Sequence, residues 1–230
     1  MSRLKGIAEF AIDTVYPKRC AGCGRRGSWL CVDCDRGMAR FAPPWCDRCG
    51  VPNALSHCGC VSPTGNSIDV RSVGPFAGWL RSAILALKYQ GEWGRVEHLG
   101  PMLVTTATSL GPADMMVPVP LHATRLRERG FNQSQLLAEW MGRELDQPVV
   151  PLLFRRRATR SQARLSAPER GPNVADAFGV VEPGSERFIG ATIMLVDDVI
   201  TTGATLRACA DALLASGANR VCAATLAREL

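Results

Sequence analysis

The chain has 230 residues, of which 47% are hydrophobic, so it is long enough for one domain with a packed core and a small additional module. It lacks a run of about 18 uncharged apolar residues, and the sequence therefore predicts no membrane-spanning helix. Its net charge of +6 is modest, but ten arginines and five acidic residues lie between residues 121 and 170, an excess that favours a polyanionic ligand.

The first 17 residues are predicted to form an amphipathic helix that ends at Pro17. Their apolar residues recur at helical spacing: Leu4, Ile7, Ala8, Ala11 and Val15. Arg3, Lys5, Glu9 and Asp13 interrupt the apolar residues, and no small-residue cleavage site follows, so the segment does not resemble a secretory signal. We therefore expect a cytoplasmic protein whose N-terminal helix packs on the rest of the molecule.

Cysteine pairs dominate residues 18–60, which are poor in long apolar runs. Eight of the ten cysteines lie there, as Cys20 and Cys23, Cys31 and Cys34, Cys46 and Cys49, and Cys58 and Cys60. A Cys-x-x-Cys turn directs two thiolates at one metal, and two such pairs complete a tetrahedral zinc shell. Eight thiolates match two zinc ions with no open coordination position, which predicts structural rather than catalytic zinc.

The assignment of the cysteine pairs to the two zinc ions stays open in the sequence. Consecutive use, with the first four cysteines on one ion and the last four on the other, is the simplest arrangement, and an interleaved one is the alternative. The last pair is shorter by one residue, and His57 beside Cys58 is an alternative ligand there. Cys209 and Cys222 stand alone and are expected to be buried as small apolar residues.

From residue 65 onward, apolar segments typical of strands alternate with segments at helical spacing. Strands are predicted at residues 69–75, 115–119, 193–196 and 221–226, and helices at 79–89, 132–145 and 204–216, with Gly217 ending the last helix. Such alternation favours an α/β fold in which a parallel sheet carries helices on both faces.

Two basic segments connect these elements. A loop after the strand at 115–119 carries Arg125, Arg127 and Arg129, which suit bidentate hydrogen bonds to phosphate; the alternative is a helix start in which they pair with Glu128. Residues 155–178 are polar, basic and without a clear period, which is typical of a lid or binding loop. A lid excludes water from a reactive ligand; the alternatives are a surface excursion or a nucleic-acid contact.

Residues 193–205 combine the features of a phosphate site. The strand at 193–196 is expected to deliver Asp197 and Asp198 to its carboxyl end, where ligands bind in open α/β sheets. A turn into a helix follows: Thr201, Thr202, Gly203, Ala204 and Thr205. Gly203 permits close approach of the backbone, N–H groups and hydroxyls offer donors, and the helix N-terminus favours an anion. The lysine of a nucleoside-triphosphate loop is missing, which disfavours nucleotide hydrolysis.

This segment resembles the ribose-phosphate motif of type I phosphoribosyltransferases. The resemblance implies that Asp197 and Asp198 contact the 2- and 3-hydroxyls of phosphoribosyl diphosphate (PRPP) and, as candidate catalytic residues, stabilise positive charge on the sugar. It implies that residues 201–205 surround the 5-phosphate of PRPP or of another ribose 5-phosphate ligand, and that the arginine loop receives the diphosphate. Mg²⁺ would bridge diphosphate and ribose oxygens.

The order of motifs along nearly the whole chain is similar to that of the competence protein F (ComF) family, which joins a double zinc ribbon to a phosphoribosyltransferase domain. The motifs are the cysteine pairs, Leu87-Lys88-Tyr89, the Arg-Gly-Phe-Asn-Gln run at 129–133, Thr159 with Gln162, Arg170 with Asn173, and residues 193–205. The resemblance implies a double zinc ribbon and linker at 18–64, a type I phosphoribosyltransferase fold with a mostly parallel sheet at 65–230, and Lys88 as a further substrate ligand. The parts that match the family least are residues 1–17, the short final cysteine pair, and Gly171-Pro172, which stiffens the predicted lid.

Two functional classes follow from the resemblance. The first is Mg²⁺-dependent phosphoribosyl transfer from PRPP to an unknown acceptor, connected with DNA uptake or nucleotide metabolism. The second is a binding protein that senses a phosphoribosyl ligand or handles DNA, with single-stranded DNA or the competence machinery as partners. Residues 223–230, near which this fold usually chooses a nucleobase, contain no stacking aromatic, so the acceptor stays open, as does the oligomeric state.

Overall fold

The structure is a computed structural model that describes residues 17–46, 49–52, 68–156, 177–181 and 188–230. Several predictions fall outside these residues: the N-terminal helix, the linker, His57, Cys58, Cys60, and most of the lid with Thr159, Gln162, Arg170, Gly171-Pro172 and Asn173. No helix in the described ranges is both long and apolar enough to cross a membrane.

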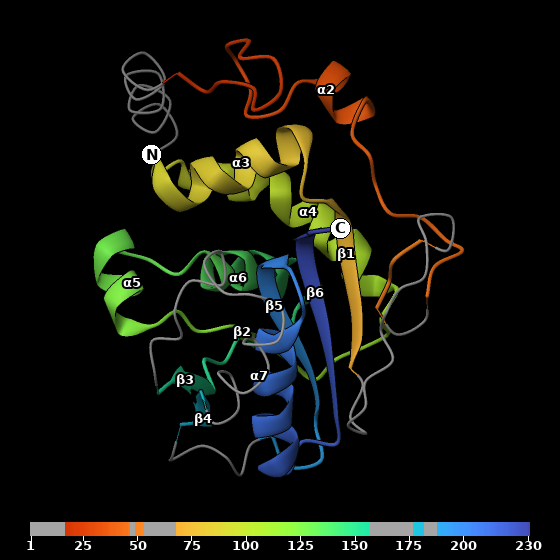
Figure 1. Ribbon diagram of the computed structural model, residues 1–230, viewed down its shortest axis with the longest axis vertical. Coiled ribbons are helices and arrows are strands. Elements are labelled where there is room, and N and C mark those ends of the chain that lie inside the picture. Colours follow the sequence, from red (N-terminus) through yellow and green to blue (C-terminus); the bar gives the residue numbers. More distant parts are fainter. Residues whose placement is uncertain (1–16, 47–48, 53–67, 157–176, 182–187) are drawn as a thin grey trace.

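Parallel strands form the central sheet, in the order β1-β6-β5-β2. They are β1 (Asp69–Pro75), β2 (Met115–Pro118), β5 (Thr192–Ile200) and β6 (Arg220–Arg228). The central strands β5 and β6 are almost continuously buried, because helices cover both faces of the sheet (Figure 1). The predicted α/β fold, with a parallel sheet and flanking helices, is therefore confirmed.

Side chains alternate between the two faces of the sheet and form two hydrophobic cores. The helices around the sheet are α3 (Gly78–Tyr89), α4 (Val96–Thr108), α6 (Gln133–Leu145) and α7 (Ala204–Ala215). On β5, Ile193 and Leu195 face the core beneath α7, whereas Met194 and Val196 face the core beneath α3, α4 and α6. In Figure 1, α3 lies across the carboxyl ends of the strands, so its last residues approach the edge where ligands bind in such sheets.

Helix α4 is an element that the sequence analysis did not predict. Its buried residues Leu99, Leu103 and Ala107 follow helical spacing and face the core shared with α6. Gly100 and Pro101 lie within this pattern and hide it in the sequence. Gly100 is required by packing, because a Cβ atom there would lie 2.3 Å from the ring of Trp140.

The arginine segment is a helix rather than the predicted loop. Helix α5 (Ala123–Arg129) has no buried residue, so it lacks the apolar stripe by which helices are recognised in a sequence. His122 caps its start, because Nδ1 accepts a hydrogen bond from the backbone N–H of Thr124 at 3.2 Å. Gly130, with a φ of 79°, ends it in the left-handed conformation.

The two ends of the predicted lid pair with each other as a short antiparallel ribbon. Strand β3 (Leu153–Arg155) runs beside β4 (Phe178–Val180), and Arg155 lies opposite Phe178. Of these residues, only Arg155 and Phe178 fall in the segment at 155–178 that was predicted to be irregular. Burial of Leu153 and Phe178 in the core beneath α7 explains why both strands are ordered.

The N-terminal cysteine region, described over residues 17–46 and 49–52 and called the zinc module below, packs on the edge of β1 and on the segment that follows α3. It contains the short helix α2 (Val32–Arg36), and it contacts the 3-10 helix η2 (Trp93–Arg95) of the larger domain. The backbone N–H of Phe41 donates to the carbonyl of Val73 at 2.9 Å, which extends the sheet edge. Arg228 donates to the carbonyl of Cys49 at 2.8 Å.

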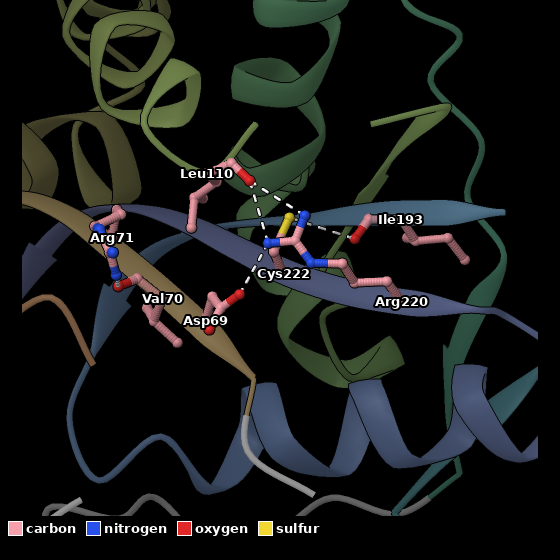
Figure 2. A network of polar contacts seen from close by, with 7 residues as sticks. All are labelled: Asp69, Val70, Arg71, Leu110, Ile193, Arg220 and Cys222. Carbon is pink, nitrogen blue, oxygen red and sulfur yellow. Dashed lines mark hydrogen bonds and ion pairs between the residues drawn. The ribbon is translucent and has the colours of Figure 1, made fainter. Parts of the chain in front are cut away.

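Figure 2 shows the amino-terminal edge of the sheet, opposite the carboxyl ends of its strands. Arg220 forms an ion pair with Asp69 at 2.8 Å and donates to the carbonyl of Leu110 at 3.2 Å, which joins β6 to β1 and to the residues after α4. Cys222 is fully buried, and its Sγ lies 3.7 Å from the carbonyl oxygen of Ile193. Burial raises the pKa of Cys222 to about 11. Cys209 is also fully buried, so both lone cysteines are small core residues as predicted.

Candidate functional site

A cavity of about 270 Å³ lies beyond the carboxyl ends of β2 and β5. It is lined by residues from α3, from α5, from the end of β3, and from β5 with the turn that follows it. Most predicted site residues meet there: Lys88, Arg125, Arg129, Asp197, Asp198, Thr201, Gly203, Ala204 and Thr205. Thr202 and Arg127 are not in its lining; both are exposed.

The sequence predicted a strand that ends at residue 196, with the acid pair just after it. In the structure the acid pair lies within β5. The strand continues to Ile200 because its pairing with β6 continues to Arg228. Asp197 and Asp198 are consequently buried, with 9% and 4% of their surface exposed. Asp197 Oδ1 accepts hydrogen bonds from Ser134 Oγ and from the backbone N–H of Asp198, both at 2.9 Å.

Burial and the neighbouring carboxylate of Asp198 raise the pKa of Asp197 to about 7. The backbone N–H of Asp198, the ammonium of Lys88 and the hydroxyl of Ser134 act in the opposite direction. An acid with a pKa in this range changes its charge near neutral pH, as groups at functional sites often do. A cation brought to the site would favour its ionised form.

Lys88 brings a positive charge to the acid pair from the last turn of α3. Its Nζ atom lies 2.7 Å from Asp198 Oδ1. The second oxygen of Asp198, Oδ2, is buried and has no hydrogen-bond partner in the described part of the chain. A buried acceptor without a donor is costly for a folded protein, and a ligand hydroxyl or a cation at this position would satisfy it.

The three arginines of helix α5 do not all face the cavity. Arg125 and Arg129 are four residues apart, lie on one side of the helix and line the cavity, whereas Arg127 lies between them and faces away. Arg129 donates to Gln133 Oε1, and its guanidinium lies 5.1 Å from the ring centre of Tyr89. Arg125 and Arg129 are therefore candidates for binding a ligand in the cavity, whereas Arg127 is a surface residue.

Arg155 is a cavity residue that the site prediction missed. It stands at the end of β3, and its guanidinium lies 5.3 Å from the ring centre of Phe178. Burial, and then the charge of Arg125, lower the pKa of Arg155. With Lys88, Arg125 and Arg129 it gives the cavity four cationic side chains against two carboxylates. Such an excess of positive charge favours a polyanion.

The turn after β5 presents backbone groups to the same cavity. Gly203 has a φ of 76°, a conformation that favours glycine, and it precedes the first turn of α7. Thr202 stabilises the turn from outside: its hydroxyl accepts from the N–H of Ala204 at 3.4 Å, and its carbonyl accepts from Arg207 at 3.0 Å. The N-terminus of α7 thus faces the cavity, where its dipole favours an anion.

The first four cysteines of the zinc module form a separate metal site. The sulfur atoms of Cys20, Cys23, Cys31 and Cys34 all lie within 4.8 Å of one another. Cys31 Sγ is 3.7 Å from the sulfurs of both Cys20 and Cys23, which matches the edge of about 3.8 Å in a tetrahedron with Zn–S bonds of about 2.3 Å. The structure therefore brings these cysteines together in the consecutive arrangement.

The backbone around Cys20 favours a thiolate. Burial raises the pKa of Cys20, but N–H groups of Cys23, Cys31 and Gly22 donate to its sulfur and lower the pKa to about 6. One of these donors, the N–H of Cys31, lies 3.4 Å from Sγ. Four sulfur ligands leave no open position on zinc, so this site is structural.

Sequence comparisons identify known families on both parts of the chain. The double zinc ribbon domain matches residues 11–62, and the phosphoribosyl transferase domain matches residues 136–230. Competence protein F of Haemophilus influenzae is 30% identical over 209 residues, covering 86% of this chain and 90% of that protein. The DNA utilization protein YhgH of Escherichia coli K12 is 34% identical over 218 residues, covering 89% of this chain and 92% of that protein. Competence protein ComFC of Bacillus subtilis is 26% identical over 212 residues, covering 87% of this chain and 84% of that protein.

Proposed function

The chain belongs to the competence protein F family, and from that premise we propose that it is a Mg²⁺-dependent phosphoribosyltransferase that takes PRPP in the cavity between α3, α5 and β5. One observation carries the proposal: an acid pair, a phosphate-type turn and four cationic side chains from separate parts of the chain converge on one cavity. No single one of these features specifies PRPP, but a ribose with phosphates at two ends needs all three.

Each group then has a role toward PRPP. The turn at residues 201–205 and the N-terminus of α7 bind the 5-phosphate, with Thr201, Gly203, Ala204 and Thr205 as the cavity-facing residues. Arg125 and Arg129, joined by Arg155, bind the diphosphate through charge-assisted hydrogen bonds. Asp197 and Asp198 accept hydrogen bonds from the ribose hydroxyls, and Lys88 holds Asp198 in position.

The reaction replaces one bond at the anomeric carbon of the ribose. The bond from C1 to the diphosphate oxygen breaks, and the diphosphate leaves with the electron pair. A lone pair of the acceptor forms the new bond to C1, and the acceptor proton passes to water. Positive charge develops on the sugar during this exchange, and the buried carboxylates of Asp197 and Asp198 stabilise it.

The donor set of the cavity fits Mg²⁺ that is bound mainly through the substrate. Asp197 and Asp198 offer hard oxygen ligands, and Asp198 Oδ2 is a buried acceptor without a donor. Two carboxylates are too few for an octahedral protein cage, so substrate oxygens and water would complete the shell. When bound, the ion neutralises charge on the departing diphosphate.

Turnover is tested with the zinc-loaded full chain, PRPP, Mg²⁺ and a mixture of small metabolites extracted from bacterial cells. Mass spectrometry is used to search for species that have gained a phosphoribosyl group, and phosphorus NMR follows diphosphate release. The proposal predicts both signals in the wild type and neither in Asp198→Asn. PRPP that stays intact in all samples would contradict catalysis.

A binding protein without turnover is the second candidate, and the names of the relatives favour it. One group is called DNA utilization proteins and another competence proteins, and this chain carries a net charge of +6. Under this alternative the chain binds a phosphoribosyl ligand and single-stranded DNA. DNA binding through phosphates weakens steeply as salt increases, so a titration of dT20 at several salt concentrations separates this candidate from an enzyme that ignores DNA.

A further inference from the structure

We infer that Ser134 is a positioning residue that holds the carboxylate of Asp197 ready to accept a hydrogen bond from a ribose hydroxyl, so that the cavity selects a ribose phosphate over its 2-deoxyribose counterpart. The inference rests on the proposed function and names what selects the sugar of that substrate. Ser134 is not among the residues that line the cavity, so it acts through Asp197 and not on the ligand. It was not predicted as a site residue, and it directly follows the Arg-Gly-Phe-Asn-Gln run at 129–133.

The two oxygens of the Asp197 carboxylate have different surroundings. Oδ1 accepts hydrogen bonds from Ser134 Oγ and from the backbone N–H of Asp198, both at 2.9 Å, and these are the hydrogen bonds that the carboxylate receives from the described part of the chain. Because Asp197 also lines the cavity, Oδ2 is the oxygen left for a ligand. A carboxylate accepts at both oxygens, so holding one of them sets the direction in which the other is presented.

The hydroxyl of Ser134 is shielded from water. The residue is only 1% exposed, so water does not compete for the hydroxyl. An ionised carboxylate can only accept, and the hydroxyl is therefore the donor. Hydrogen bonds to charged groups are stronger than neutral ones, and they weaken steeply when their angle is distorted. Ser134 thus restrains the orientation of Asp197 before any ligand arrives.

A closed ring of hydrogen bonds fixes Ser134 relative to the strand that carries Asp197. Asn132 Oδ1 accepts from the backbone N–H of Ser134 at 3.1 Å, and Asn132 Nδ2 donates to the carbonyl of Val119 at 3.0 Å. The N–H of Val119 donates in turn to the carbonyl of Val196, the residue before Asp197, at 3.0 Å. The contact from Ser134 to Asp197 closes the ring, so the start of α6 is tied to β5 by two routes.

The residue between Asn132 and Ser134 has a matching role in another part of the cavity. Gln133 accepts a hydrogen bond from Arg129, which is assigned to the diphosphate, and Gln133 is itself only 3% exposed. Three consecutive side chains at the start of α6 thus reach the end of β2, an arginine of α5 and an acid of β5. They set the relative positions of the groups that bind the two parts of PRPP, as the supporting residues of a binding site do.

Selection of the sugar follows from a carboxylate that is held in place. A 2-hydroxyl that donates to Asp197 forms a charge-assisted hydrogen bond, whereas a 2-deoxyribose leaves the buried oxygen without a donor. Sites built to bind a hydroxyl in this way reject the analogue that lacks it. Loss of the Ser134 hydroxyl should therefore reduce the part of the affinity that depends on the ligand hydroxyl, and leave the part that depends on the phosphate.

The test measures whether the hydroxyl of Ser134 and the 2-hydroxyl of the ligand act together. Ribose 5-phosphate and 2-deoxyribose 5-phosphate are titrated into the zinc-loaded full chain, and phosphorus NMR gives both affinities. The variants are Ser134→Ala, which removes the hydroxyl, and Ser134→Thr, which keeps it. Thr106→Val is the matched control, because it removes a half-buried hydroxyl that donates to a main-chain carbonyl, that of Met102 at 2.9 Å.

We expect the wild type to bind ribose 5-phosphate at least about tenfold more tightly than the deoxy sugar, the usual effect of one hydrogen bond to a charged group. In Ser134→Ala this ratio should fall below about threefold, because ribose 5-phosphate binds more weakly while the affinity for the deoxy sugar changes less than about twofold. Ser134→Thr and Thr106→Val should keep the wild-type ratio. Should Ser134→Ala fail to fold, Ser134→Cys, whose thiol is a weaker donor, replaces it and should give an intermediate ratio.

Three results would overturn the inference: the wild type binds both sugars equally, Ser134→Ala keeps the wild-type ratio, or Ser134→Ala loses affinity for both sugars to the same extent, which would give Ser134 a structural role only. The PRPP affinity of the wild type is measured in parallel with Mg²⁺ present. A wild type that binds PRPP while the sugar ratio ignores Ser134 overturns this inference and leaves the proposed function intact, whereas failure to bind PRPP overturns the proposed function itself.

Discussion

Lys88 Nζ lies 2.7 Å from Asp198 Oδ1, and this ion pair joins the last turn of α3 to the strand that carries the acid pair. The Lys88 side chain is 16% exposed and that of Asp198 only 5%, so water screens the pair weakly. The contact therefore has two roles: it compensates a buried carboxylate, and it fixes the end of α3 against the candidate site.

Lys88→Met should lower the free energy of unfolding by about 3 kcal/mol, because it leaves the buried carboxylate of Asp198 without its cation. Asp198→Asn should cost less, and the double variant should cost less than the sum of both. Urea denaturation measures all three. Arg81→Met, which removes an exposed cation from the same helix, is the control, and strictly additive costs would contradict the pairing.

The stability of the wild type should depend on pH through Asp197. Its pKa is raised in the folded state to about 7, so between roughly pH 4 and pH 7 the folded chain binds more protons than the unfolded one, and stability falls as pH rises through this window. Relative to Asp197→Asn, the wild type should lose up to about 1.4 kcal/mol per pH unit, with the difference levelling off above about pH 7. Denaturation between pH 5.5 and 8 measures this difference. A difference between the wild type and the variant that does not change with pH over this range would show that the acid is ionised throughout, and would contradict the raised pKa.

The three arginines of α5 should differ in their effect on PRPP affinity. Arg125→Ala and Arg129→Ala should each weaken binding about tenfold or more, because each removes a charge-assisted hydrogen bond to phosphate. Arg127→Ala removes the same charge from the opposite side of the helix and should change affinity less than about twofold. Fluorescence titration compares the three. Equal losses would indicate a general charge effect and contradict the assignment of Arg125 and Arg129 as ligands.

Arg95 should couple the zinc module to the candidate site. It donates to the carbonyls of Trp29 at 3.1 Å and Arg19 at 3.2 Å, and its guanidinium lies 4.8 Å from the ring centre of Trp29. Arg95→Ala should lower stability by about 2 kcal/mol and weaken PRPP binding, because η2 continues directly from the segment that carries Lys88. Zinc content, measured by elemental mass spectrometry, should stay unchanged in this variant.

Removing zinc is the complementary experiment. Cys31→Ser or chelation should lower the melting temperature and reduce PRPP affinity to a similar extent as Arg95→Ala, since both release the first cysteine site from η2. A zinc-free chain that binds PRPP as well as the loaded one would show that the module is independent of the cavity.

The parts of the fold that sequence could predict are those in which local chemistry and local structure coincide. Cys20 to Cys34 are close in the chain and in space, and the residues of 193–205 form one strand and one turn. Helix α4 was missed because Gly100, which packing against Trp140 requires, interrupts the helical pattern. The position of the acids within β5 was missed because it depends on pairing with a strand at the end of the chain.

The parts of the site that sequence could not predict come from long-range packing. Ser134 is an ordinary residue in the first turn of α6 until the fold brings it to Asp197. Arg155 was one of many arginines in a segment without a period, and only its pairing opposite Phe178 aims it at the cavity. Tyr89 belongs to the Leu87-Lys88-Tyr89 motif, but its place in the lining of the cavity follows only from the fold, which brings the end of α3 to the end of β5.

The central claim is that the cavity beside Lys88 and Asp198 binds PRPP, and calorimetry with the zinc-loaded full chain tests it most directly. PRPP is titrated in the presence of Mg²⁺ into the wild type and into Asp198→Asn. The account predicts one PRPP bound per wild-type chain and an affinity at least about tenfold lower in the variant. No binding to the wild type, or equal affinity in both proteins, would contradict it.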